Sequence, residues 1–73
     1  MSMTEKVKPS LDGLKQILSQ ETGVRVADIT DDLAPTILQL SRISDMCGRR
    51  FGQQLDEGAG PRNVGDIRRE LGV

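Results

Sequence analysis

The chain has 73 residues, with 10 Lys+Arg against 11 Asp+Glu, a formal net charge of -1 and a pI near 5.2. This length allows one small domain, near the lower limit at which a chain buries enough apolar surface to fold alone. The near-balance of charge argues against broad, charge-driven binding to nucleic acid, which needs a basic face to replace phosphate counterions. We therefore expect no nucleic-acid partner.

The residue types also restrict the chemistry. The chain has no histidine and one cysteine, Cys47, which excludes an internal disulfide and any Ser-His or Cys-His nucleophile pair, and argues against a zinc site. The acidic pairs at 31–32 and 56–57 are adjacent in sequence and indicate solvated loops rather than a catalytic dyad. No apolar run is long enough to span a bilayer, and the polar start MSMTEKVKPS has no signal-peptide pattern. We expect a cytoplasmic protein that is not an enzyme, holds no metal or cofactor and contacts no membrane.

Three helical segments are predicted, and the first follows a polar start. Residues 1–9 lack apolar periodicity and are expected to form a flexible tail, which leaves 10–73 as the domain. Ser10 can cap a helix whose apolar residues recur at helical spacing as far as the stop signal at Gly23. The following stretch, VRVADITDDL, has no sustained helical period. It is predicted to be a long loop held to the core by single apolar anchors, namely Val24, Val26, Ile29 and Leu33.

The second helix is predicted to begin near Pro35 or Thr36, since proline suits a first turn and threonine is an acceptable cap. Its apolar face is predicted to comprise Ile37, Leu40, Ile43, Cys47 and Phe51, with Leu38 and Met46 flanking it. Gly48 weakens a helix by about 1 kcal/mol relative to alanine, which allows fraying beyond Cys47. Because Cys47 lies on the apolar face, we expect it to act as a small core hydrophobe with an inert thiol.

A last helix is predicted after the turn-rich connection DEGAGPR. Asn63 is its cap, and Asp66 three residues later gives a short variant of the capping box. The buried stripe of this helix is expected to comprise Val64, Ile67 and Leu71. The predicted fold is therefore all-α, a small bundle of three or four helices with a long loop between the first two. Its predicted core consists of Leu14, Ile17, Leu18, Ile29, Leu33, Leu40, Ile43, Phe51, Val64 and Ile67.

The order and spacing of these elements resemble the acyl and peptidyl carrier proteins of fatty-acid, polyketide and nonribosomal-peptide synthesis. The similarity covers roughly residues 11–71. It depends on GVRVADITDDL after the first helix, RRFGQQL near the end of the second and NVGDIRREL at the last. The resemblance implies a carrier-protein-like helical bundle. In that family a Gly-x-Asp-Ser-Leu motif opens the second helix, and its serine carries 4'-phosphopantetheine.

In this chain a hydrocarbon side chain occupies the position of that serine. A phenylalanine usually follows the family's serine by fourteen residues, and counting back from Phe51 reaches Ile37, so the motif corresponds to residues 34–38. Isoleucine has no oxygen that could attack coenzyme A, and we expect the prosthetic arm to be absent. Two other hydroxyls are alternatives. Thr36 points about 100° away around a helix, and Ser41 breaks the spacing to Phe51.

The charge of the second helix also departs from the family, in which this helix is typically acidic and is recognised by basic patches on enzymes. Residues 36–55 hold three arginines against one aspartate, a net charge of +2. Opposite charge steers association and like charge suppresses wrong partners, so a basic helix should disfavour the usual carrier-binding enzymes. The residues expected to contact a partner are Asp31, Asp32, Leu38, Arg42, Asp45, Arg49 and Arg50.

Three interpretations of function remain. The favoured one is a non-catalytic, carrier-like protein without 4'-phosphopantetheine that binds a synthase or tailoring enzyme of a carrier-dependent pathway. The second is a genuine acyl or peptidyl carrier loaded at Thr36 or Ser41. The third is a small helical regulatory or DNA-binding protein that uses Arg62, Arg68 and Arg69, although the near-neutral charge counts against it.

Overall fold

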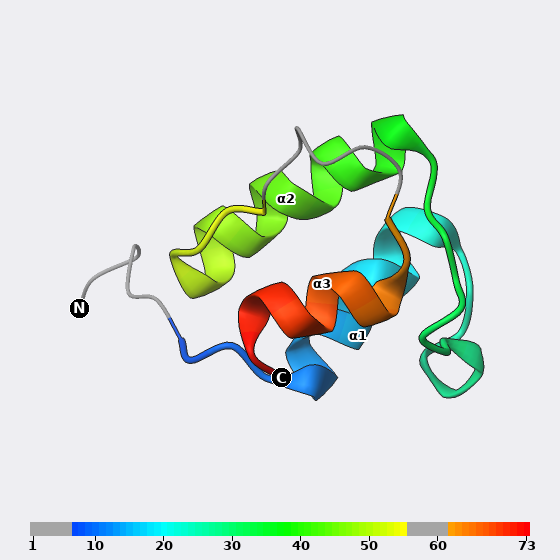
Figure 1. Ribbon diagram of the computed structural model, residues 1–73, viewed down its shortest axis with the longest axis horizontal. Coiled ribbons are helices and arrows are strands. Elements are labelled where there is room, and N and C mark those ends of the chain that lie inside the picture. Colours follow the sequence, from blue (N-terminus) through cyan, green and yellow to red (C-terminus); the bar gives the residue numbers. More distant parts are fainter. Residues whose placement is uncertain (1–6, 56–61) are drawn as a thin grey trace.

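The computed structural model describes residues 7–55 and 62–73, and within these ranges the fold is all-α (Figure 1). It contains α1 (Leu11–Thr22), a short 3-10 helix η1 (Val26–Asp28), α2 (Ile37–Phe51) and α3 (Val64–Leu71). In Figure 1, α2 runs along one side of the molecule, and α3 lies in front of α1 on the other. The prediction of a compact all-α domain with a long loop between its first two helices is confirmed, with three α-helices and no strand in the described parts.

Local capping signals set the ends of the helices. The Ser10 hydroxyl accepts a hydrogen bond from the Gly13 amide at 3.0 Å, and α1 ends at Gly23, whose φ of 78° lies in the left-handed region that favours glycine. Asn63 caps α3 by accepting from the Asp66 amide at 2.9 Å. Each of these caps was predicted from sequence.

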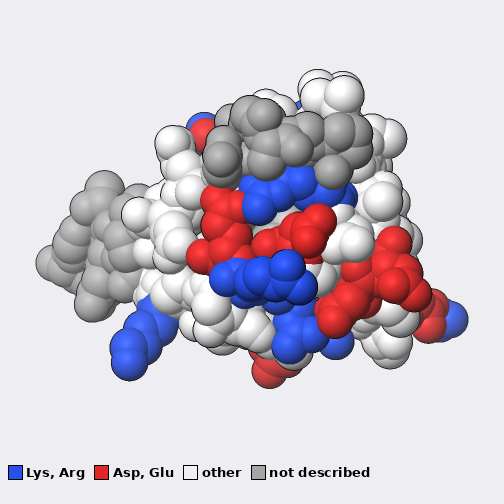
Figure 2. Space-filling view, viewed as in Figure 1, with Lys and Arg blue, Asp and Glu red and all other residues white. Residues whose placement is uncertain are grey.

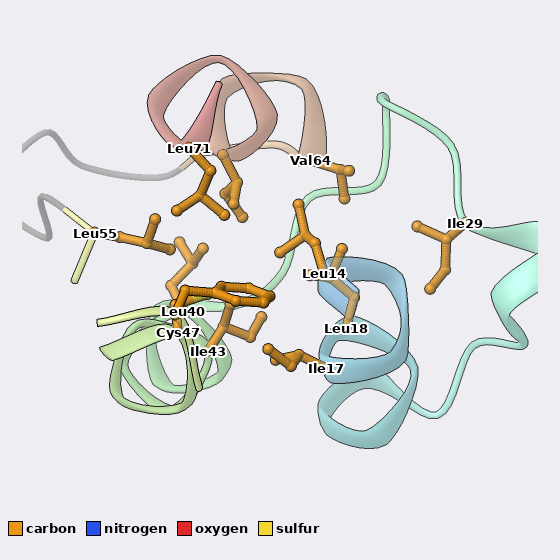
Figure 3. Close-up of a cluster of buried hydrophobic side chains, with 12 residues drawn as sticks. Leu14, Ile17, Leu18, Ile29, Leu40, Ile43, Cys47, Leu55, Val64 and Leu71 are labelled. Atoms are coloured by element: carbon orange, nitrogen blue, oxygen red, sulfur yellow. The ribbon is translucent and has the colours of Figure 1, made fainter. Parts of the chain in front are cut away.

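The core lies between the three helices (Figure 3). Side chains from α1, α2 and α3 converge there, and Ile29 reaches in from the long loop while Leu55 closes the opposite side. Nine of the ten predicted core residues are buried; Leu33 is half-buried and packs against the cluster. The full buried set is Leu14, Ile17, Leu18, Ile29, Leu40, Ile43, Cys47, Phe51, Leu55, Val64, Ile67 and Leu71.

The long loop differs from its prediction at one anchor. Val26 begins η1 and is exposed, so the expectation that it anchors the loop to the core was wrong. The 3-10 turn explains the difference, because it directs residues 26–28 away from the core; none of the three is buried. The anchors that remain are Ile29, which is buried, with Val24 and Leu33 packed against the core.

The end of α2 is held by a bond within the core. Ser44 is almost fully buried, and its hydroxyl accepts from the Leu55 amide at 3.1 Å and lies 3.4 Å from the Leu55 carbonyl oxygen. This bond holds the chain after the helix against its side. The helix continues past Cys47 to Phe51. At Gly48 a Cβ would lie 2.8 Å from Cγ of Gln54, an exposed side chain that would have to shift.

The expected flexible tail falls largely on residues 1–6, which lie outside the described residues. Of the part that is described, Val7 donates its amide proton to the Arg50 carbonyl at 2.9 Å. Among the helices of the described ranges, none is both long and apolar enough to cross a membrane.

Candidate functional site at the start of α2

The start of α2 presents two hydrocarbon side chains to solvent. Ile37 is the first residue of the helix and 74% exposed, and Leu38 beside it is 64% exposed. Thr36 is the N-cap of this helix: its hydroxyl accepts from the Gln39 amide at 3.1 Å, and the Gln39 side chain accepts from the Thr36 amide at 2.9 Å. This reciprocal capping box fixes the first turn. Position 37 is therefore accessible at the first turn of a capped helix, and its side chain carries no nucleophilic oxygen.

The two alternative hydroxyls occupy different settings. The hydroxyl of Thr36 is engaged in the capping box, as expected. Ser41 is exposed one turn further along α2, on the rim of a shallow hollow that Arg42 and Asp45 also line. A hydroxyl with no positioned base beside it is a weak nucleophile at its ordinary pKa, so neither setting supplies activation from within the described chain.

The three arginines of α2 are spread over about 100° of its exposed surface. Arg42 and Arg49 are seven residues apart, which places them about 20° from each other around the helix. Arg50 lies about 100° further round from Arg49, and its Nη2 reaches Oε1 of Gln16 on α1 at 3.4 Å. All three are exposed. Arg42 and Arg49 therefore lie close together around α2, and Arg50 lies off their line on the side toward α1. Asp45 forms an ion pair with Arg49 at 3.2 Å.

Asp31 and Asp32 precede the site in an exposed turn. Asp31 accepts hydrogen bonds from Nη1 of Arg68 at 3.0 and 3.2 Å, and its carbonyl oxygen accepts from the Gly65 amide at 3.1 Å. The Leu33 carbonyl accepts similarly from the Val64 amide at 2.9 Å. These bonds satisfy the first amides of α3, which have no partner within a helix. Asp31 thus joins the long loop to α3, a structural role that the sequence pattern did not indicate.

Cys47 is fully buried, in agreement with its expected place in the core. Burial in apolar surroundings raises the pKa of its thiol from 9.0 to about 11. Because the thiolate is the nucleophilic form, this thiol is inert near neutral pH. In the described ranges, no group of three or more potential metal-ligating residues comes together.

The surface over α3 has mixed charge. Figure 2 shows acidic and basic side chains interleaved on the face that carries α3 in Figure 1, rather than one basic patch. Two of the three arginines considered for DNA binding are in ion pairs, Arg68 with Asp31 and Arg62 with Glu70. The Arg62–Glu70 pair is also largely shielded from water. This arrangement does not support a phosphate-binding face, which requires cations that are free to replace counterions.

Comparison with known proteins gives no match: no family model fits the chain, no curated protein matches it, and no solved structure matches it.

Proposed function

We propose that this chain is a non-catalytic, carrier-like protein of the cytoplasm that lacks the 4'-phosphopantetheine arm and acts by binding a protein partner. The partner would be a synthase or tailoring enzyme of a fatty-acid, polyketide or nonribosomal-peptide type of pathway. The proposal combines the sequence resemblance to acyl and peptidyl carrier proteins with the geometry at the start of α2.

The observation that carries the proposal is the setting of Ile37. A side chain at the first position of a capped helix, 74% exposed, is displayed to solvent rather than used in packing, and is free to contact a partner. In a carrier, this is where a serine would receive the prosthetic arm. Isoleucine at this position is equally exposed but has no hydroxyl oxygen, so the side chain can serve only as an apolar contact point beside Leu38.

The proposal is tested by measuring the intact mass of the native protein after incubation with coenzyme A and a broad-specificity phosphopantetheinyl transferase. We expect no mass gain, because the displayed position has no nucleophile. A gain mapped to Thr36 or Ser41 would refute the missing arm and establish the second interpretation, a genuine carrier. An active carrier protein in the same reaction is the positive control.

A further inference from the structure

The outer face of α2 combines apolar and basic side chains in one line. Leu38, Arg42 and Arg49 lie within about 40° of one another around the helix, given 3.6 residues per turn. All are exposed, on the side opposite the core-facing residues. Ile37 is exposed in the first turn but lies about 100° around the helix from Leu38, so it flanks this line and does not extend it. The line of Leu38, Arg42 and Arg49, together with Ile37 at its flank, is called the α2 stripe below.

We propose that the α2 stripe docks on an acidic protein surface that has an apolar recess for Ile37 and Leu38 and carboxylates beside it for Arg42 and Arg49. This inference rests on the proposed function, because it takes the chain to act by binding a protein. It adds the footprint and the chemistry of that partner.

The apolar end of the stripe sets the anchor. Single exposed hydrophobic residues are common on protein surfaces. In the described residues, however, only four large hydrophobics are exposed, and two of them, Ile37 and Leu38, are adjacent on one helical turn. Both belong to a turn whose backbone is fixed by a capping box, so little backbone entropy is lost when they enter a recess. Apolar anchors in a desolvated recess are the usual source of affinity at an interface.

The basic end determines the charge of the partner. Arg42 takes part in none of the ion pairs formed within the described chain, whereas Arg49 is paired with Asp45 at 3.2 Å. Arg42 therefore presents the less compensated charge. With a rise of 1.5 Å per residue, Arg42 lies about 6 Å and Arg49 about 17 Å along the axis from Leu38. The partner should present carboxylates at these two offsets from its apolar recess.

A second copy of the chain is a poorer occupant than an acidic protein. Between residues 37 and 51 the helix carries three arginines and one aspartate. Two such faces would bring a net charge of +2 against another +2, and like charges across an interface are unfavourable. An acidic surface instead gains from the same arrangement.

Arg50 supplies a matched control within the same helix. It carries the same charge as Arg42 and is also exposed, but it lies about 80° around the helix from Arg42, on the side toward α1, where it contacts Gln16. Arg50→Glu changes the net charge of the protein as much as Arg42→Glu does. A long-range charge effect would weaken binding equally in both variants, whereas contact through the stripe would weaken it only in Arg42→Glu.

The test is an NMR titration of the 15N-labelled full chain with two synthetic amphipathic helical peptides, both with leucines on one face. One peptide has glutamates flanking the leucines, and the other has lysines there. We expect the glutamate peptide alone to shift the amide signals of residues 37–49. Leu38→Ala and Arg42→Glu should each weaken its binding by about fivefold or more, Arg49→Glu by less, and Arg50→Glu by under about twofold.

Four results would overturn the inference: no binding of the glutamate peptide, equal binding of the lysine peptide, shifts away from the stripe, or an equal loss in Arg42→Glu and Arg50→Glu. Shifts of α2 signals with protein concentration alone would identify a second copy as the occupant and also overturn it. Each of these results leaves the missing arm untouched. Conversely, loading of the native chain would refute the proposed function while the peptide result stood.

Discussion

Replacing Phe51 with alanine should remove a large part of the stability of the domain. The ring is 7% exposed and lies against the backbone of α1, since a Cβ built on Gly13 would be 3.1 Å from its Cζ. A buried aromatic side chain removes roughly 150–250 Å² from water, which at about 25 cal/mol per Å² corresponds to roughly 4–6 kcal/mol as an upper bound. Phe→Ala substitutions in cores cost about 3–5 kcal/mol. A 73-residue domain has a total stability of only about 4–11 kcal/mol.

The assay is urea unfolding followed by circular dichroism at 222 nm, because the chain has no tryptophan or tyrosine to report by fluorescence. With a slope near 1 kcal/mol per molar urea, Phe51→Ala should lower the midpoint by about 3–5 M or leave the variant unfolded without urea. Phe51→Leu keeps most of the apolar volume and should cost less than about 2 kcal/mol. A midpoint for Phe51→Ala within about 0.5 M of the native value would show that the ring does not hold α1 against α2.

Three further substitutions or conditions test the capping, the buried hydroxyl and the thiol. Asn63→Ala removes the acceptor for the Asp66 amide and should lower the free energy of unfolding by about 0.5–2 kcal/mol, measured by the same urea titration, while Asn63→Gly should cost only a few tenths. Ser44→Ala leaves the buried Leu55 amide without its partner and should cost about 1–3 kcal/mol; an unchanged midpoint would mean that water replaces the hydroxyl. Since burial raises the pKa of Cys47 from 9.0 to about 11, the folded state holds this proton more tightly than the unfolded state. Stability should therefore fall as pH rises from about 9 through 11. Cys47→Ala should remove that part of the decline, and an identical pH profile would contradict the assignment.

The helix ends were predictable because their causes are local. Ser10, Thr36 and Asn63 each bond to an amide three residues ahead, and Gly23 adopts a left-handed conformation that few other residues tolerate. Such signals lie within one turn of the residue and can be identified in the sequence. Most of the core was predictable too, because the spacing of apolar residues along a helix is also a local pattern.

Features that depend on distant residues were not predictable. Asp31 and Arg68 are 37 residues apart, and nothing near either one indicates that they form an ion pair. The Leu55 amide and the Ser44 hydroxyl that accepts its bond are 11 residues apart, and local spacing does not indicate this bond. The turn that exposes Val26 depends on the path of the whole loop. At the candidate site, helical spacing placed Ile37 on the apolar face of the second helix, and this was wrong, because Ile37 is exposed at the first turn, before the helix packs on the core. The turn of Arg50 toward α1 also required the structure.

The most direct test of a carrier-like domain without its arm is to restore the missing oxygen. Ile37→Ser places a hydroxyl at the first, exposed position of α2 without disturbing the core, because the side chain it replaces makes no part of the buried cluster. Intact mass is measured after incubation with coenzyme A and a broad-specificity transferase, for Ile37→Ser alone and with Arg42→Glu and Arg49→Glu added. The account predicts that both variants with Ile37→Ser gain the mass of phosphopantetheine, mapped to position 37, and that the native chain gains none. Loading should be faster in the variant that also carries Arg42→Glu and Arg49→Glu. Absence of loading in both serine variants, with their helical content intact, would contradict it.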